Sequence, residues 1–283
     1  MQRWPDRIEA VLRARSEAFF SLESAVRSGQ NPEAIHDMRV ASRRLQEVLR
    51  LVFPDHPDLA GPLRILRRAR RVQSRVRDLD VMIARVRGMG RDAKGDTPAA
   101  LRFFGGRLVG LRKRRLRKMA GILVDLDLAR LHVELEGLVA RLQDSPDTGL
   151  TRTTVQRRAQ AHIRIRAEAF RKAVLASREG LASDDLHRAR IAGKRLRYAM
   201  EIADELRLGG FKKRIALLRD IQQSLGRWHD LEVLEETIAG LTATRSMFQR
   251  RLPVVRATCG LIAGWREEKR KLVQEYLHLT RGI

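Results

Sequence analysis

A basic helical stretch that occurs twice constrains the fold of this chain more than any other feature. The first copy, HDMRVASRRLQEVLR, spans residues 36–50, and the second, HRARIAGKRLRYAME, spans residues 187–201. At about 100° per residue, each copy predicts a helix that buries one face and presents a row of cations on the other. The basic faces contain His36, Arg39, Arg43 and Arg50 in the first copy, and His187, Arg190, Lys194 and, at the edge, Arg197 in the second.

The charge of the chain points to an anionic partner. Its 283 residues carry a formal net charge of +24, while an apolar content of 43% is enough for a packed core. Self-repulsion on this scale opposes compaction unless anions neutralise it. Arginine outnumbers lysine by 49 to 9, and its planar guanidinium can grip a phosphate with two hydrogen bonds. A GC-rich genome produces the same bias, so the arginine content supports a phosphate ligand only weakly.

Cysteine usage fits a reducing compartment, and hydropathy predicts no membrane-spanning segment. Cys259 is the only cysteine, which excludes a disulfide within the chain and a cluster of thiolates around a metal. No apolar run approaches the roughly 20 residues that span a bilayer. The first residues, MQRWPDRIEAVLR, are interrupted by charges and do not read as a secretory signal. We therefore expect a cytoplasmic protein.

Apolar periodicity predicts an all-α fold. Asn31 is expected to cap a helix with Pro32 in its first turn, and Pro253 is expected to kink the last helix. The third helix carries a basic stripe of its own, formed by Arg64, Arg67, Arg68, Arg71 and Arg75. The predicted helices span about 4–28, 32–53, 59–87, 98–124, 128–142, 153–177, 184–208, 211–238 and 242–279.

Three motifs recur in the same order and indicate an internal duplication. RxRxEAF at 13–19 returns at 164–170, HxxR at 36–39 returns at 187–190, and RVRDLDVM at 75–82 returns as RWHDLEVL at 227–234. The QDSPDTGLTR segment between the copies is the best internal boundary. The order predicts one domain made of two four-helix bundles, residues 1–145 and 150–283, which a pseudo-two-fold axis relates.

These motifs resemble the CHAD family, the conserved histidine α-helical domain, over essentially the whole chain. The resemblance rests on IHDMRVASRRL and RDLDVM in the first half, and on LHRARIAGKRLRYAMEI and LGRWHDLEVL in the second. It implies two four-helix bundles with a basic central surface that binds inorganic polyphosphate, and association with polyphosphate granules. It also implies that this surface is lined by His36, Arg39, Arg43, Arg44, His187, Arg190, Lys194, Arg195 and Arg197.

Arginines of the third helix and its second copy complete the predicted binding set. They are Arg68, Arg71 and Arg75, with Arg227 in the second half. Gln46 departs from the family pattern, where a further basic residue is frequent. In the second copy of the third helix, Asp220, Gln222 and Gln223 replace arginines. We therefore expect the first half to hold more of the anion.

Three functions fit these patterns to different degrees. Non-enzymatic binding of polyphosphate, without cofactor or metal, is the leading hypothesis. A nucleic-acid-binding protein is the alternative, because the same net charge permits it, and a metal-dependent phosphohydrolase is the third. Neither HExxH, GxSxG nor a P-loop is present.

The acids and histidines of the repeated motifs are interpreted in the same terms. Asp78, Asp80, Asp230 and Glu232 are expected to position arginines rather than to catalyse. His36 and His187 are expected to donate to phosphate, or alternatively to form structural hydrogen bonds between helices. The surrounding positive charge opposes a divalent metal at either histidine. The sequence leaves the oligomeric state open.

Overall fold

The chain folds into helices that pack along one another in two groups. The structure is a computed structural model that describes residues 4–54, 56–90, 94–144, 150–243 and 245–283. The described residues form helices and no strand, which confirms the all-α prediction. None of these helices is long and apolar enough to cross a membrane. The helices are α1 (Trp4–Phe20), α2 (Glu23–Ser28), α3 (Pro32–Val52), α4 (Ala60–Met89), α5 (Thr97–Asp125), α6 (Leu128–Asp144), α7 (Arg152–Gly180), α8 (Ser183–Glu205), α9 (Lys212–Thr242), α10 (Arg245–Arg250) and α11 (Leu252–Leu279), with a short 3-10 helix, η1 (Pro57–Leu59).

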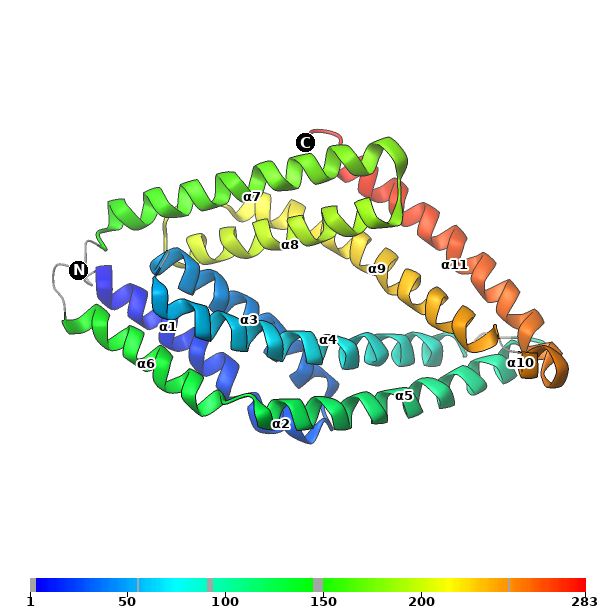
Figure 1. Ribbon diagram of the computed structural model, residues 1–283. Coiled ribbons are helices and arrows are strands. Elements are labelled where there is room, and N and C mark those ends of the chain that lie inside the picture. Colours follow the sequence, from blue (N-terminus) through cyan, green and yellow to red (C-terminus); the bar gives the residue numbers. More distant parts are fainter. Residues whose placement is uncertain (1–3, 55, 91–93, 145–149, 244) are drawn as a thin grey trace.

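The two groups repeat one order of packing. In the first, α1 packs on α3, α3 on α4, and α4 on α5, while α6 packs on both α1 and α4. In the second, α7 packs on α8, α8 on α9, and α9 on α11 (Figure 1). The helices that carry the repeated motifs therefore have matching neighbours. Helices α2 and α6 make the first group larger than the four-helix bundle predicted for it.

Contacts between the groups include two pairs of helices that share repeated motifs, α3 with α8 and α4 with α9. Helix α5 also contacts α11, and α3 contacts α7. Two ion pairs also cross between the groups in a reciprocal way. Arg15 of α1 lies 2.5 Å from Glu205 of α8, and Arg166 of α7 lies 3.9 Å from Glu47 of α3. A pseudo-two-fold axis produces this kind of exchange, while the duplication itself stays a prediction from the sequence.

Helix α3 forms as its sequence predicts. The Asn31 side chain accepts a hydrogen bond from the backbone N–H of Glu33 at 2.9 Å, with Pro32 in the first turn, so the predicted cap is confirmed. The apolar face of α3 is buried, and so is the matching face of α8. These buried residues include Ile35, Met38, Leu45, Val48 and Leu49 in α3, and Leu186, Ala189, Leu196, Met200 and Ala203 in α8.

Two predicted helices are divided in the structure. The first was expected to run to about Ser28, but α1 ends at Phe20 and α2 begins at Glu23. The last was expected to continue through Pro253 with a kink. Instead α10 ends at Arg250, and Pro253 lies in the first turn of α11. Proline lacks the N–H that an interior helical position donates, so a new helix beginning there avoids the lost hydrogen bond.

The predicted boundary between the halves falls between α6 and α7. Helix α6 ends at Asp144 and α7 begins at Arg152. The intervening residues 145–149 lie outside the described part of the chain. The division into two halves therefore stays a prediction, and the cavity described next draws on both of them.

Candidate anion-binding site

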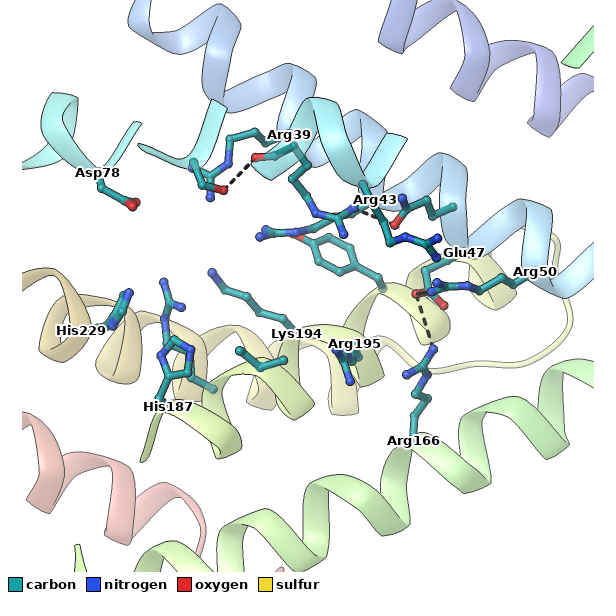
Figure 2. Close-up of a pocket in the computed structure, with 17 residues that line it drawn as sticks. Arg39, Arg43, Glu47, Arg50, Asp78, Arg166, His187, Lys194, Arg195 and His229 are labelled. Carbon is teal, nitrogen blue, oxygen red and sulfur yellow. Dashed lines mark hydrogen bonds and ion pairs between the residues drawn. The ribbon is translucent and has the colours of Figure 1, made fainter. Parts of the chain in front are cut away.

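A cationic cavity of about 530 Å³ lies where α3 and α4 meet α7, α8 and α9. Eight arginines and one lysine line it, against only two carboxylates. Figure 2 shows side chains from both halves converging on this space. The lining residues are Arg39, Arg43, Gln46, Glu47, Arg50, Arg67, Arg70, Ser74, Asp78, Arg166, His187, Arg190, Ile191, Lys194, Arg195, Tyr198 and His229.

Arg39 and Arg190 occupy matching positions on α3 and α8. Each side chain is largely withdrawn from solvent, and its Nε is buried without a hydrogen-bond acceptor among the described residues. Burial, followed by the charge of Arg43, lowers the pKa of Arg39 to about 10. Burial likewise lowers the pKa of Arg190. The protein therefore holds two buried guanidinium Nε–H donors that no acceptor among the described residues satisfies.

Lys194 lies one turn beyond Arg190 on α8 and reaches toward α3 (Figure 2). Burial, then the charges of Arg190, Arg43 and Arg39, lower the pKa of its amine to about 6. Like charges and desolvation both disfavour an ammonium ion here. The amine is therefore mostly neutral at pH 7 in the protein alone.

Two histidines lie together at one end of the cavity. The rings of His187 on α8 and His229 on α9 have centroids 5.0 Å apart. Burial and the charge of Arg190 lower the pKa of His229 to about 3, and the same two causes lower the pKa of His187. Both rings are therefore neutral at pH 7, and each can offer one N–H donor.

Neutral side chains hold two cavity arginines in place. Gln46 accepts a hydrogen bond from Arg70 at 2.6 Å, so the residue that departs from the family pattern positions a cation of the neighbouring helix. The Tyr198 ring lies 6.0 Å from the guanidinium carbon of Arg43 and 4.7 Å from that of Arg197. This aromatic face is thus engaged by arginine within the protein.

Glu47 closes the opposite end of the cavity and ties α3 to α7. Its carboxylate lies 2.9 Å from His162 Nε2, 3.5 Å from Arg50 and 3.9 Å from Arg166. Burial alone would raise the pKa of Glu47, but the His162 hydrogen bond and the nearby arginines outweigh it and lower the pKa. Glu47 therefore neutralises part of this end (Figure 2).

The structure brings some of the predicted binding residues into the cavity and leaves others outside it. Those that line it are Arg39, Arg43, His187, Arg190, Lys194 and Arg195. Those that do not are His36, Arg44, Arg68, Arg71, Arg75, Arg197 and Arg227.

Ion pairs account for three of the residues outside the cavity. Arg44 lies 3.3 Å from Glu201, and Arg197 lies 2.8 Å from the same carboxylate. Arg227 lies 3.2 Å from Glu268. Each of these arginines is paired with a protein carboxylate, which holds its side chain away from the cavity.

The remaining predicted residues are exposed on the outside of their helices. Arg68, Arg71 and Arg75 form an exposed stripe on α4, whereas Arg67 and Arg70 of the same helix line the cavity. At about 100° per residue, Arg71 stands next to the Arg67 side of the helix. The stripe therefore begins at the rim. His36 is exposed on α3 and does not contribute to the lining.

The lining residues outside the predicted binding set include Arg70, Arg166, Tyr198 and His229. A signal was present for two of them. Arg166 is the second arginine of the repeated RxRxEAF motif, and His229 precedes Asp230 in the repeated HDLE segment. Arg70 and Tyr198 are visible only from the way the helices pack.

Of the acids that were expected to position arginines, Asp80 does so, whereas Glu232 pairs with a lysine. Asp78 lines the cavity, Asp80 is paired with Arg112, and Glu232 lies 2.5 Å from Lys269. In the described part of the chain, no three His, Cys, Asp or Glu side chains are grouped so that they could hold a metal ion.

A family model and solved structures match this chain, whereas no curated protein does. The crystal structure of the CHAD domain from the plant Ricinus communis superposes with a TM-score of 0.69 at 22% identity, covering 99% of this chain and 92% of that one. PptA from Streptomyces chartreusis superposes with a TM-score of 0.66 at 16% identity, covering 98% and 99%. The CHAD domain matches residues 10–239, and this chain therefore belongs to the CHAD family.

Proposed function

We propose that the chain binds inorganic polyphosphate in the cationic cavity and leaves the polymer chemically unchanged. The observation that carries this proposal is the pair of buried Nε donors on Arg39 and Arg190, which lack an acceptor among the described residues. A buried donor without an acceptor costs about 1–3 kcal/mol. Phosphate oxygens placed between α3 and α8 would satisfy both donors and offset the repulsion among the cations.

The chemistry of the lining favours a phosphate polymer over other anions. Polyphosphate presents acceptor oxygens on every unit, and the lining offers guanidinium groups, one amine and imidazole N–H groups. The described lining contains one phenol ring, Tyr198, which Arg43 and Arg197 already contact. A ligand with stacking bases would find little to stack on.

Long chains extend beyond the cavity in this account. The exposed α4 stripe of Arg68, Arg71 and Arg75 begins at the rim, and none of these arginines has an acid partner among the described residues. A polymer that fills the cavity can therefore continue along α4. Affinity should rise with chain length until the stripe is covered.

Titration with polyphosphate of defined lengths at several salt concentrations tests the proposal. Because binding releases counterions, we expect affinity to fall about 10³-fold between 50 and 200 mM salt for roughly six phosphate contacts. We also expect longer chains to bind more tightly than short ones. Affinity that is independent of salt and of length would contradict electrostatic binding.

Nucleic acid is the alternative ligand, because the net charge of +24 attracts any polyanion. Competition separates the two. We expect polyphosphate to displace duplex DNA or RNA at a much lower phosphate concentration than the reverse exchange requires. Displacement of polyphosphate by low concentrations of nucleic acid would favour the alternative.

Binding without turnover is part of the proposal. Incubation with polyphosphate and magnesium or manganese should release no orthophosphate above the rate of the buffer. Release that depends on the protein would establish a phosphohydrolase instead. We further propose that the protein associates with polyphosphate granules in the cytoplasm, which a fluorescent fusion should show only in cells that accumulate the polymer.

A further inference from the structure

Lys194 is unusual among the cations of the cavity. It projects from α8 toward α3, among the arginines that converge there (Figure 2). It forms neither a hydrogen bond nor an ion pair with any residue in the described part of the chain. A lysine placed among arginines without an acceptor is poorly suited to carry its own charge near neutral pH, and a nearby anion would favour the charged form.

Charged and titratable groups face this amine from each neighbouring helix. The cations of the cavity include Arg39 and Arg43 on α3, Arg67 and Arg70 on α4, Arg190 on α8, and Arg166 on α7, which Glu47 partly neutralises. The imidazoles of His187 on α8 and His229 on α9 are titratable but neutral at pH 7. The acids that face it are Asp78 on α4 and Asp230 on α9.

At the Lys194 amine, burial and repulsion from nearby arginines outweigh attraction by the nearby carboxylate. Burial lowers the pKa of Lys194 most, followed by Arg190, Arg43 and Arg39, while Asp230 opposes them. The resulting pKa is about 6. In the protein alone at pH 7.5, only a few per cent of the molecules therefore carry an ammonium at Lys194.

We propose that polyphosphate binding charges Lys194, so that each bound chain takes up a proton from solvent. The proposal rests on the proposed function, and no bond other than the new N–H forms or breaks. Phosphate oxygens beside the amine supply the opposite charge that the protein lacks. The ammonium then donates to them, and the repulsion from the arginines is offset.

The sign of the resulting pH dependence follows directly. The pKa of Lys194 is about 6 in the free protein and higher in the complex. As the pH rises between these two values, the uptake of one proton makes the polyphosphate affinity fall up to about tenfold per pH unit. Below about pH 6 the amine is already charged and contributes no further dependence. His187 and His229 change in the same direction, because burial and Arg190 lower both pKa values and an anion would raise them.

Calorimetric titration in buffers of different ionisation enthalpy measures the protons taken up. The titrations use polyphosphate of one defined length at pH 7.5, with wild type, Lys194→Arg, Lys194→Gln and, as a matched loss of an exposed lysine outside the cavity, Lys271→Gln. Terminal phosphates of the ligand also exchange protons, but they contribute equally to every variant. The comparison between variants therefore isolates Lys194.

We expect wild type to take up about one proton more than either Lys194 variant, and Lys271→Gln to match wild type. Lys194→Arg stays charged, so its affinity should depend less steeply on pH than that of the wild type. Between pH 7 and 8.5 the two slopes should differ by up to about tenfold per pH unit. Equal uptake by wild type and both Lys194 variants would overturn this inference and leave polyphosphate binding intact. An absence of binding by the wild type would overturn both.

Discussion

Helices α4 and α9 occupy matching places in the two halves but hold their positive charge in different ways. Residues 1–145 contain 30 basic and 18 acidic residues, and residues 146–283 contain 28 and 16, so each part has a formal charge of +12. The exposed arginine stripe of α4 has no acid partner in the described part of the chain. On α9, Arg219 lies 3.3 Å from Glu201 and Arg227 lies 3.2 Å from Glu268.

From this difference we infer that pairing with acids, rather than total charge, decides which surface attracts an anion. An exposed ion pair stabilises a fold by only about 0–1 kcal/mol. It nevertheless lowers the net positive charge that the arginine presents to an approaching anion. The second half contributes to the cavity mainly through α8, where Arg190 and Lys194 have no acid partner among the described residues. The first half contributes through both α3 and α4.

The largest effect is expected where the two halves meet. Arg39→Ala combined with Arg190→Ala should weaken polyphosphate binding at least 10²-fold, because hydrogen bonds to charged groups are worth about 1.5–3 kcal/mol each. The fold should persist, since both groups are buried next to like charges. Affinity comes from calorimetric titration and folding from thermal melting.

Arg219→Ala with Arg227→Ala is the matched control, because it removes the same number of charges from α9. Similar losses in the two double variants would mean that net charge alone governs binding. That result would remove the distinction between paired and unpaired cations.

The next effect concerns the contact between α3 and α7. Glu47→Gln should destabilise the fold by about 3 kcal/mol, because it leaves His162, Arg50 and Arg166 without their shared carboxylate. The folded-state pKa of Glu47 is depressed, so its stabilisation is present above the unfolded value near 4.5 and is lost as pH falls through the folded value.

Thermal melting between pH 7 and 3 measures this contribution. Wild type should lose more stability than Glu47→Gln as the pH falls below about 4.5. Glu168→Gln, which removes an exposed carboxylate of α7, is the control and should behave as wild type does. Parallel pH profiles for wild type and Glu47→Gln would contradict the assigned role.

A smaller effect is expected on the α4 stripe. Replacing Arg68, Arg71 and Arg75 by glutamine should weaken binding of long polyphosphate about tenfold, because exposed charges contribute less than buried ones. Binding of chains short enough to stay inside the cavity should change less than about twofold. Titration with a short and a long polymer provides the measurement. An equal loss for both lengths would place the stripe inside the primary site.

The smallest effect is expected on α9. Arg227→Gln should change polyphosphate affinity less than about twofold and reduce the free energy of unfolding by at most about 1 kcal/mol. The pairing of Arg227 with Glu268 is the reason. A clear loss of affinity in this variant would show that Arg227 contributes to binding, as the sequence predicted.

The sequence predicts the framework of the molecule better than the lining of the cavity. The capped start of α3 and the buried faces of α3 and α8 follow from residue types at fixed spacings, which are local properties. Arg197 was predicted to bind but does not line the cavity, and Glu201, one turn later, already signals an ion pair within the helix. Glu201 also pairs with Arg44 of α3, and this contact depends on how α3 packs against α8.

Other lining residues depend on how distant helices meet. Arg70 faces the cavity because Gln46 of α3 holds it, and Arg166 does so because α7 packs beside Glu47. The spacing of arginines within one helix does not show which edge of the basic stripe another helix covers. The exposed side of α4 and its cavity side were therefore indistinguishable in the sequence.

We propose that both halves of the protein hold one phosphate polymer in a shared cavity. A crystal structure of the protein with a short linear polyphosphate would locate the polymer. We expect phosphate oxygens within hydrogen-bonding distance of Arg39 from α3 and of Arg190 and Lys194 from α8 in the same complex. Polyphosphate bound only outside the cavity, with these three side chains still without a ligand, would contradict it.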